Sequence, residues 1–338
     1  MMKKAIPLIV FALLMVAASH GGDEWWSIYF TVCAGNPGAR GNPEGGLVKI
    51  IDGAVDHFYG AFYQVTSPRV AGALCRARAR GVDVKIVTES DTFMMKESYA
   101  GRFREAGIEA VGDESRGLMH NKFAVVDGGM VWTGSYNPTP KGSARHDENA
   151  ILIRSPELAA IYTAEFMEMF RDRVFGNRSE PGPFAGILNR HHVRIGESDI
   201  NVYFSPEDNV ERIILGRLRK AESSICFMAY SFTSESIGEM MIRRHREGVD
   251  VRGVFERRGA KAPYGEYIKM KIEGVPVRLD RNRHAMHHKV IVIDGRRVIT
   301  GSYNFSRNAA RNNDENLLVI DNRRIAAAYL AEFNRLYR

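Results

Sequence analysis

An internal repeat constrains the fold of this 338-residue chain more than any other feature of its sequence. The tetrapeptide Gly-Val-Asp-Val begins at Gly81 and again at Gly248. Other matching pairs keep the same separation, namely Thr66-Ser67 with Thr233-Ser234, Gly134-Ser135-Tyr136-Asn137 with Gly301-Ser302-Tyr303-Asn304, and Asp147-Glu148-Asn149 with Asp314-Glu315-Asn316. A separation held over so long a stretch indicates two copies of one folding unit. Because solenoids stack three or more repeats, two copies predict an internal dimer instead.

Within each copy, short apolar runs rich in β-branched residues alternate with helical patterns. In the second copy we predict helices over residues 209–221 and 234–247. The predicted strands of that copy are residues 201–204, 224–230, 249–255, 275–279, 289–293, 298–300 and 317–320. Helices that alternate with strands in this way cover both faces of a mixed sheet. The predicted fold class is therefore α/β, with two repeated α/β/α sandwich units.

Composition shifts along the chain suggest where each unit begins and ends. Residues 177–198 contain Pro181-Gly182-Pro183 and show little periodicity, so we predict a linker there. The first unit is then expected over residues 25–176 and the second over residues 199–338. Since both copies are present in one chain, no homodimer is required.

Residues 1–20 have the layout of a secretory signal peptide. Lys3 and Lys4 precede an apolar run over residues 5–18, and small residues follow it. This run is short for a bilayer span, which needs about 20 residues. We therefore predict export to the periplasm or beyond the cell, with cleavage near Ser19 or His20. An uncleaved leader that anchors the protein in the membrane is the alternative.

The net charge indicates which kind of partner the protein attracts, and the cysteine content bears on zinc sites and disulfides. The formal net charge is +7, and the excess of basic residues outside the leader lies in the second half, which would attract an acidic partner. The cysteines Cys33, Cys75 and Cys226 lack paired spacing, so neither a zinc site nor a disulfide framework is indicated. Cys226 lies in an apolar run and is expected to be a core thiol. A Cys33–Cys75 bridge is the less favoured alternative.

Each copy carries the same set of polar residues. The first set is His120, Lys122, Asp127, Gly134-Ser135-Tyr136-Asn137 and Glu148, and the second is His287, Lys289, Asp294, Gly301-Ser302-Tyr303-Asn304 and Glu315. Each histidine and lysine are two residues apart at the start of an apolar strand, so both side chains project from one face. One such pair would be ordinary surface decoration. Two complete sets in register favour a functional site, because sheet packing alone would select apolar residues there.

These residue types suit chemistry on a phosphate. A lysine neutralises phosphate oxygens while a neutral imidazole supplies a nucleophile or a proton. An asparagine adds an uncharged donor, and the Gly-Ser pair lets the backbone approach closely. A buried glutamate can hold the second imidazole nitrogen and fix which nitrogen faces the substrate.

The spacing His-x-Lys, four residues, Asp, six residues, Gly-Ser-x-Asn resembles the signature of the phospholipase D superfamily, and both copies match it fully. The resemblance covers about residues 25–338 and implies two phospholipase D-like units packed about a pseudo-twofold axis. The second half, including Ala229-Tyr230-Ser231-Phe232-Thr233-Ser234, is similar to the small bacterial endonucleases of that superfamily, which act as homodimers. The chain thus looks like such a dimer joined in tandem.

The resemblance also implies roles for individual residues. His120 and His287 would meet at one site, where one forms a phosphohistidine and the other protonates the leaving oxygen; we favour His120 as the nucleophile. The phosphate oxygens would be held by Lys122, Lys289, Asn137 and Asn304, and the imidazoles would be oriented by Glu148 and Glu315. Asp127 and Asp294 would be structural. Neither a metal nor another cofactor is expected.

These residues are compatible with three functions. Arginines crowd the second motif, so we favour an exported nuclease without sequence preference, which binds the backbone of DNA or RNA through Arg281, Arg283, Arg307, Ser135 and Ser302. The alternative is a phospholipase D or phospholipid transferase that acts on phosphatidylcholine or cardiolipin. A non-catalytic phosphate-binding module is disfavoured by two intact motifs. The additional histidines His146 and His288 are interpreted as bystanders or rim contacts, and His191-His192 is given no role.

Overall fold

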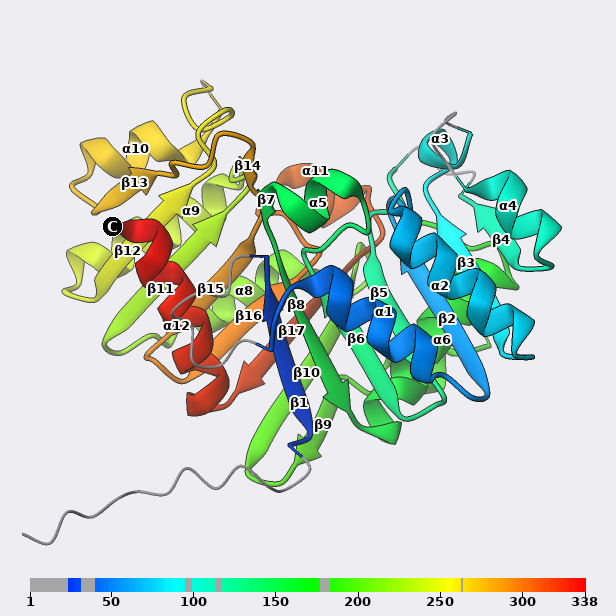
Figure 1. Cartoon of the computed structure of the whole chain (residues 1–338). Coiled ribbons are helices and arrows are strands. Elements are labelled where there is room, and N and C mark those ends of the chain that lie inside the picture. The colour runs from blue at the N-terminus through cyan, green and yellow to red at the C-terminus, as the bar shows by residue number, and fades with distance from the viewer. Residues whose placement is uncertain (1–23, 32–39, 95–98, 114–116, 177–182, 263) are drawn as a thin grey trace, which may run out of the picture.

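The computed structural model describes residues 24–31, 40–94, 99–113, 117–176, 183–262 and 264–338. Two α/β units lie side by side (Figure 1). The small elements between them are α5 (Pro140–Ala144), β7 (His146–Asp147), β14 (Ala285–Met286) and α11 (Arg307–Arg311). The expected leader over residues 1–20, Cys33 and residues 177–182 of the expected linker lie outside the described residues.

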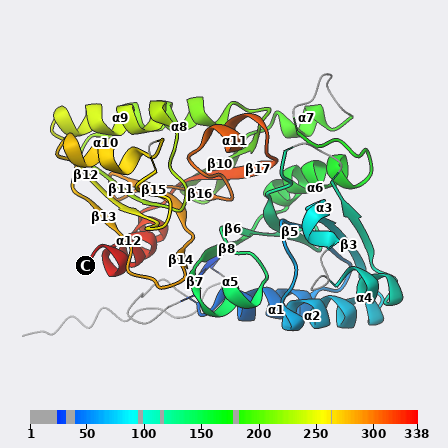
Figure 2. The same ribbon diagram turned by 90° about the horizontal axis from the view of Figure 1, so that it is seen from above.

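The first unit is built on a seven-stranded mixed sheet with the order β1-β8-β6-β5-β2-β3-β4. Strands β2, β3 and β4 are parallel to one another, and the other neighbours are antiparallel. The strands are β1 (Trp26–Phe30), β2 (His57–Phe62), β3 (Asp83–Thr88), β4 (Glu109–Gly112), β5 (Lys122–Val126), β6 (Met130–Gly134) and β8 (Asn149–Arg154). Helices α1 (Pro43–Gly53) and α2 (Pro68–Ala79) cover one face, and α6 (Pro156–Phe170) covers the other (Figure 2). Shorter helices are α3 (Ser90–Phe93), α4 (Ala100–Glu105) and α5 (Pro140–Ala144).

The second unit repeats this plan on an eight-stranded sheet with the order β13-β12-β11-β15-β16-β17-β10-β9. The strands are β9 (His192–Ile195), β10 (Ser198–Ser205), β11 (Ser224–Ala229), β12 (Asp250–Phe255), β13 (Val277–Leu279), β15 (Lys289–Ile293), β16 (Arg297–Gly301) and β17 (Glu315–Asp321). One face is covered by α8 (Val210–Arg219), α9 (Glu235–Arg246) and α10 (Glu266–Ile272), and the other by α12 (Arg323–Tyr337) (Figure 2). The short helix α11 (Arg307–Arg311) follows β16. The predicted α/β fold class is confirmed.

One expectation needs correction within the range predicted as linker. Residues 185–188 form the short helix α7 (Ala185–Leu188), and β9 pairs antiparallel with β10 at the edge of the second sheet. Val193 is buried in β9, so residues 192–195 belong to the second unit, whereas α7 packs against α6 of the first unit. The alternation His-Val-Arg-Ile is too short to stand out as a strand in the sequence.

The repeated dipeptides and tetrapeptides mark the same local structures in both units. Ser67 and Ser234 cap α2 and α9, because their hydroxyls accept hydrogen bonds from the backbone N–H of Val70 and Ile237. Gly81 and Gly248 follow those helices with φ of 95° and 92°, a conformation that favours glycine. The repeat is therefore retained between the units at the positions where helices begin and end.

The two units share one hydrophobic core. A single buried cluster contains side chains of both sheets and of both α6 and α12. Tyr162 packs edge-to-face on Phe204 of the second unit, with ring centroids 5.3 Å apart, and Tyr329 packs in the same way on Phe30 of the first unit at 5.4 Å. These matched contacts across the interface follow a pseudo-twofold arrangement. The units are therefore packed together as parts of one body.

Both cysteines in the described part of the chain are free thiols. Cys226 is buried in β11, as expected for a core thiol, and burial raises its pKa to about 11. Cys75 carries no disulfide among the described residues. The expectation for a Cys33–Cys75 bridge falls on a residue outside that part of the chain.

Asp127 and Asp294 end the motif strands β5 and β15 in left-handed turns, with φ of 49° and 53°. The Asp127 carboxylate accepts hydrogen bonds from the backbone N–H groups of residues 55–57, and the Asp294 carboxylate accepts them from residues 222–224. Each aspartate thus ties the motif strand to the start of its neighbour, β2 or β11. This is a structural arrangement away from the histidines.

We expect Asp294→Ala to lower the free energy of unfolding by about 1–3 kcal/mol, because three backbone donors lose their acceptor. Asp294→Asn should cost less, since asparagine tolerates positive φ and keeps one oxygen acceptor. Urea unfolding measures both changes. Asp250→Ala, at an exposed ion pair with Arg252, is the control and should change stability by no more than about 0.5 kcal/mol. Equal losses for Asp294→Ala and Asp250→Ala would contradict this assignment.

Candidate active site

Each motif histidine is fixed by backbone pairing with the opposite unit. The His287 N–H donates to the Asp147 carbonyl at 2.9 Å, next to the two-stranded sheet that β14 (Ala285–Met286) forms with β7 (His146–Asp147). The His120 N–H donates to the Asp314 carbonyl at 3.0 Å. Each histidine therefore lies beside the segment that carries the glutamate of the other unit.

As a result, each motif histidine contacts the glutamate of the opposite unit. His120 Nδ1 lies 2.8 Å from Glu315 Oε2, and His287 Nδ1 lies 3.0 Å from Glu148 Oε2. Both carboxylates are fully buried, and the two histidines are 8% and 7% exposed. Because Nδ1 is held by a carboxylate, Nε2 is the nitrogen left for a substrate. The predicted orienting glutamates thus act across the interface, which the sequence did not indicate.

The two lysines lie directly beside the histidines. Lys122 Nζ donates to the His120 carbonyl at 2.6 Å, and Lys289 Nζ donates to the His287 carbonyl at 2.8 Å. Lys289 Nζ also lies 3.0 Å from His287 Nε2. Both ammonium groups are buried with the imidazoles, so two cations line a single small site.

A tyrosine flanks each pair, and the sequence analysis did not identify these residues as part of the site. Tyr63 has its ring 5.2 Å from that of His120 and 5.2 Å from Lys122 Nζ. Tyr230 has its ring 4.4 Å from that of His287 and 4.7 Å from Lys289 Nζ. The two tyrosines occupy equivalent positions of the repeat, which is the signal that could have found them.

Burial is the largest cause of the pKa shifts in this cluster. It lowers the pKa of His120 to about 4 and that of His287 well below its ordinary value. It also lowers the pKa of Lys122 to about 7 and that of Lys289 to about 8, and raises the pKa of Glu148 to about 8. Exclusion of water thus disfavours the charged forms of these five side chains. Lys289 acts on His120 and Lys122 acts on His287, so the two motifs form one electrostatic unit.

The serines of the two motifs do not face a substrate, which corrects their expected role. Ser135 Oγ donates to Glu148 Oε2 at 2.7 Å, and the Ser302 Oγ accepts from the backbone N–H of Asn316 at 3.0 Å. Both serines are fully buried behind the site. They hold the glutamate segments in place.

Gly134 is required by a neighbouring strand rather than by a ligand. Its φ is 149°, and a Cβ there would lie 2.4 Å from the Asn149 carbonyl oxygen. Gly301 has the same relation to Asn316. The close backbone approach predicted for the Gly-Ser pair is therefore made to the strand that follows the glutamate.

Asn137 and Asn304, which are expected to hold phosphate oxygens, follow the motif serines. The Asn137 backbone N–H donates to the Glu148 carboxylate and lowers its pKa, against the larger effect of burial. Among the described residues, the side-chain Oδ1 atoms of both asparagines are buried without a hydrogen-bond partner. No cluster of three or more histidine, cysteine or acidic side chains in that part of the chain is arranged to hold a metal ion.

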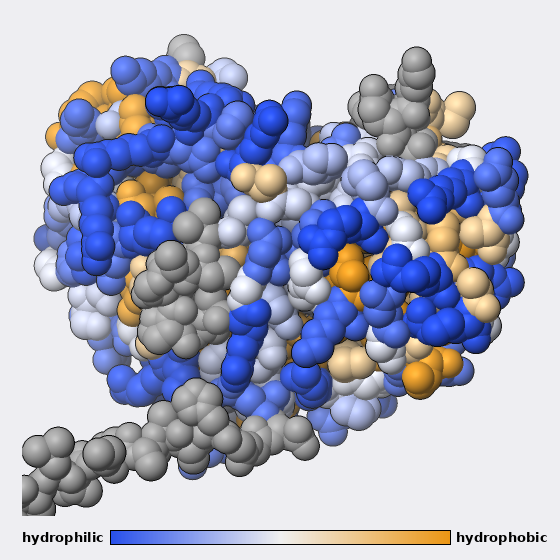
Figure 3. All heavy atoms as spheres, in the orientation of Figure 1, coloured by the Kyte–Doolittle hydropathy of each residue, from blue (hydrophilic) through white to orange (hydrophobic). Residues whose placement is uncertain are grey.

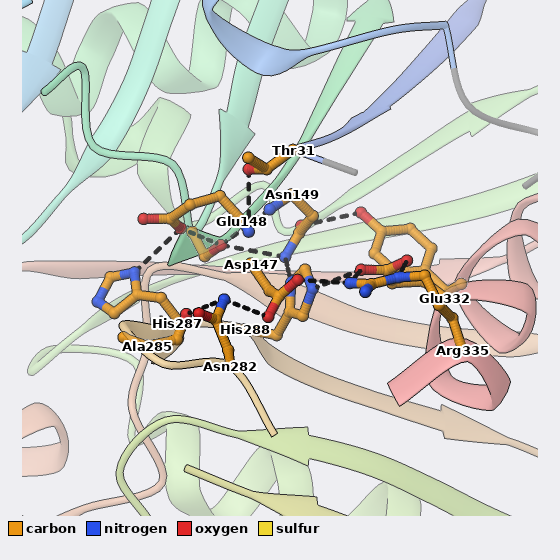
Figure 4. A network of polar contacts seen from close by, with 12 residues as sticks. Thr31, Asp147, Glu148, Asn149, Asn282, Ala285, His287, His288, Glu332 and Arg335 are labelled. Atoms are coloured by element: carbon orange, nitrogen blue, oxygen red, sulfur yellow. Dashed lines mark hydrogen bonds and ion pairs between the residues drawn. The ribbon is translucent and has the colours of Figure 1, made fainter. Parts of the chain in front are cut away.

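A buried polar network lies behind the His287–Glu148 pair (Figure 4). Asn149 Nδ2 donates to Ser135 Oγ at 3.2 Å and to His288 Nδ1 at 2.9 Å. His288 Nε2 lies 3.1 Å from Glu332 Oε1, and Arg335 links Glu332 to Asp147. His288, expected to be a bystander, is therefore a buried member of this network.

The equivalent network in the first unit has different side chains. Asn316 Nδ2 donates to Asn121 Oδ1 at 2.9 Å, and Asn121 takes the position of His288. Asn121 in turn faces the Met169 sulfur at 4.0 Å. The two halves of the site are thus related by the repeat but are not equivalent.

Basic side chains gather on the second-unit side of the site. His146 Nδ1 lies 3.9 Å from Glu148 Oε1, and its ring is 6.2 Å from that of His287, as expected for a rim contact. Burial, followed by the charges of His284, Lys141 and Arg258, lowers the pKa of His146. Arg281 and Arg283 lie on the exposed segment between β13 and β14, whereas Arg307 is exposed at the start of α11.

Two histidine–lysine pairs, each completed by a glutamate of the opposite unit, define a phosphodiesterase centre. The family model described as "Cardiolipin synthase, PLD-like domain" matches residues 47–170 and again residues 214–337. The chain belongs to the phospholipase D superfamily and contains two of its units in tandem.

Two named relatives each match less than half of the chain. A phospholipase D from Rickettsia prowazekii (strain Madrid E) is 32% identical over 160 residues, which cover 44% of this chain and 78% of that protein. A mitochondrial cardiolipin hydrolase from Xenopus laevis is 36% identical over 124 residues, which cover 37% of this chain and 59% of that protein.

Solved structures show the same architecture. The phosphatidylserine synthase of Haemophilus influenzae Rd KW20 superposes with a TM-score of 0.71 over 94% of this chain and 87% of that chain, at 15% identity. This similarity shows a shared fold. Nuc from Salmonella typhimurium, a phospholipase D family member, is 33% identical over 42% of this chain and 95% of that chain, with a TM-score of 0.39.

The pKa shifts predict a pH profile. His120, with a pKa of about 4, is neutral above that pH, and the lysines, with pKa values of about 7 and 8, lose their charge as the pH rises through those values. The kcat/KM for an anionic diester should therefore be highest on the acidic side of neutrality and fall as the pH rises, most steeply above about pH 8, because kcat/KM reports the free enzyme, in which His287, the expected proton donor, has a pKa well below its ordinary value and the lysines lose their charge. Initial rates with bis(p-nitrophenyl) phosphate from pH 3 to 10 measure this. A profile that rises up to pH 10 would contradict the lowered lysine pKa values.

Proposed function

We propose that this protein is a nuclease that cleaves the phosphodiester backbone of DNA or RNA through a phosphohistidine, without a metal ion and without sequence preference. The observation that carries the proposal is the basic rim beside His287. Arg257 and Arg258 have their guanidinium groups 3.3 and 3.1 Å from the carbonyls of Asn282 and Arg283, so they lie against the segment that leads into the second motif. A rim of this kind binds phosphates along a polynucleotide without reading its bases.

The first chemical step is an attack by His120 Nε2 on phosphorus. Glu315 accepts the hydrogen of Nδ1, so the lone pair of Nε2 points away from the carboxylate. A new N–P bond forms as the bond from phosphorus to the leaving oxygen breaks. Lys122 and Lys289 neutralise the nonbridging oxygens in a site that excludes water, where such charges act strongly.

His287 supplies the proton to the leaving oxygen. In the free protein, burial and the charges of Lys289 and Lys122 hold the pKa of His287 well below its ordinary value, so its imidazole is neutral, with Nε2 3.0 Å from Lys289 Nζ and Nδ1 facing Glu148. An arriving diester adds a negative charge and raises the pKa of the imidazole, which then takes up from solvent the proton that it passes to the leaving oxygen. In the second step, His287 takes a proton from water, whose oxygen attacks phosphorus and releases His120.

The contacts of the lysines support this assignment of roles. Lys289 donates towards the ring nitrogen Nε2 of His287, whereas Lys122 donates to the His120 carbonyl. The Nε2 lone pair of His120 is thus the one better placed for attack.

A second candidate function is phospholipid hydrolysis or transfer, which the names of the Rickettsia and Xenopus relatives favour. This function needs an apolar surface that accepts acyl chains. On the face drawn in Figure 3, hydrophilic side chains predominate and hydrophobic ones form separate small areas. Among the described helices, none has the length and apolar character needed to cross a bilayer. We favour the nuclease on the basis of the arginine rim.

We also propose that the protein is exported, on the signal-peptide layout of residues 1–20. A membrane contact would then depend on an uncleaved leader. The N-terminal sequence of protein recovered from the periplasm or the medium tests this, and full-length protein confined to the cytoplasm would exclude it.

We expect the protein to cleave plasmid, single-stranded DNA or RNA in the presence of EDTA. His120→Asn and His287→Asn should each reduce kcat by about 10³-fold or more, because both groups act as one unit. His192→Asn, at an exposed histidine paired with Asp199, is the matched control and should retain full activity. A panel that includes phosphatidylcholine and cardiolipin vesicles separates the two functions. Headgroup release with intact polynucleotide would overturn the nuclease.

A further inference from the structure

A cavity of about 220 Å³ opens next to the second motif. It is bounded by the end of β11, the end of β12 and the segment that follows β12, and its walls include Tyr230, Phe232, Phe255, Arg258 and Tyr264. Tyr230 is also the residue that packs against His287, so the cavity and the catalytic centre share one wall. A group bound there would lie next to the scissile phosphate.

The lining is aromatic at the base and at the mouth. Phe232 and Phe255 are buried and stack on each other, with ring centroids 5.5 Å apart and planes 18° from parallel. Tyr264 is 73% exposed and Tyr230 is 40% exposed, so two tyrosine rings are accessible at the opening. Exposed aromatic rings beside a basic surface are typical of sites on which nucleic acid bases stack.

A guanidinium group, that of Arg258, lies at the same opening. Arg258 donates to the Arg283 carbonyl at 3.1 Å while its side chain remains 62% exposed. Arg257 is held in the same way on the Asn282 carbonyl. Arg258 lines the cavity, where its Nε lies 4.0 Å from Glu256 Oε1 and its exposed guanidinium can contact the phosphate next to a bound nucleotide, whereas Arg257 does not line the cavity itself.

The first unit lacks this combination at the equivalent positions. Val65 replaces Phe232, Thr88 replaces Phe255, and Asp91 replaces Arg258. The charge therefore reverses at the last of these positions. Burial and then a glutamate, Glu89 or Glu256, raise the pKa of both Tyr63 and Tyr230, but Asp91 raises that of Tyr63 further whereas Arg258 lowers that of Tyr230. A polyanion with a base is thus favoured on the side of the second unit.

We propose that the cavity bounded by Tyr230 and Tyr264 is a stacking subsite for one unpaired nucleobase, which makes the protein a nuclease with a preference for single strands. This inference rests on the proposed function and specifies its substrate. Pockets that bury drug-sized ligands measure about 300–1,000 Å³, so this smaller cavity suits one base. A base in a duplex is already stacked and paired, so it would have to unstack at a cost of a few kcal/mol before it entered.

Dinucleotides provide the sharpest test, because each contains a single scissile bond. The substrates are thymidylyl-thymidine and its two analogues that lack the base on the 5′ or on the 3′ side. Tyr264→Ala should lower kcat/KM for thymidylyl-thymidine about tenfold, whereas Tyr264→Trp should retain it, since stacking on an aromatic ring contributes about that factor or more. Ile272→Ala, at an exposed apolar residue of α10 outside the cavity, is the control and should have no effect.

The abasic analogues show whether the loss arises from stacking. With the wild-type protein, one of the two analogues should be cleaved about tenfold more slowly, and Tyr264→Ala should cleave that analogue as fast as the wild type does. Equal losses for Tyr264→Ala on all three substrates would overturn the subsite and leave the nuclease intact. If the wild type cleaves no nucleotide substrate but hydrolyses cardiolipin vesicles, and Tyr264→Ala impairs that reaction, the cavity holds an acyl chain and the proposed function fails as well.

Strand preference gives a second measurement. The kcat/KM should be at least about tenfold higher for a single-stranded oligonucleotide than for the same sequence in a duplex. Arg258→Gln should weaken binding of the single strand and reduce the salt dependence of kcat/KM. Arg243→Gln, at an exposed pair on α9, is the control. Equal rates on single and double strands would overturn the preference while the nuclease assignment stood.

Discussion

The exchange of carboxylates between the two units is the constraint on which the site depends. Neither unit contains a complete histidine–glutamate pair, because Glu315 holds His120 and Glu148 holds His287. The site therefore exists only while the units keep their relative position. The pairing of β7 with β14, the equivalent hydrogen bond from His120 and the shared core around Tyr162 all maintain it. Stability of the interface and integrity of the active centre are thus the same requirement.

Joining two units in one chain lets the halves of the site diverge. In a symmetric homodimer, each substitution would appear on both sides of the phosphate. Here His288 occupies the position in the second unit that Asn121 occupies in the first. In the same way, Arg258 is equivalent to Asp91 of the first unit. The catalytic residues keep their symmetry while the residues around them do not. A substrate that differs on the two sides of its phosphorus, as every nucleotide chain does, can then bind in one orientation.

The sequence predicted the elements that depend on local pattern and the residues that depend on the repeat. The motif strands β5 and β15, the helix α9 and the histidine–lysine pairs all follow from periodicity and from the constant separation between the two copies. The exchange of Glu148 and Glu315 does not, because it depends on how two sheets pack. The serines were misread for the same reason: Ser135 faces a carboxylate that only the tertiary structure brings to it. The edge strand β9 was too short to be recognised.

Burial explains how this set of groups can bind an anion. Lysine ammonium groups in water would be strongly hydrated, but at this site their charge is disfavoured and their pKa values fall to about 7 and 8. A phosphodiester anion supplies the missing negative charge, so its binding and the full protonation of the lysines favour each other. The same anion favours a proton on His287, which lies between Lys289 and Glu148. Substrate binding therefore favours the protonation state that the chemistry requires.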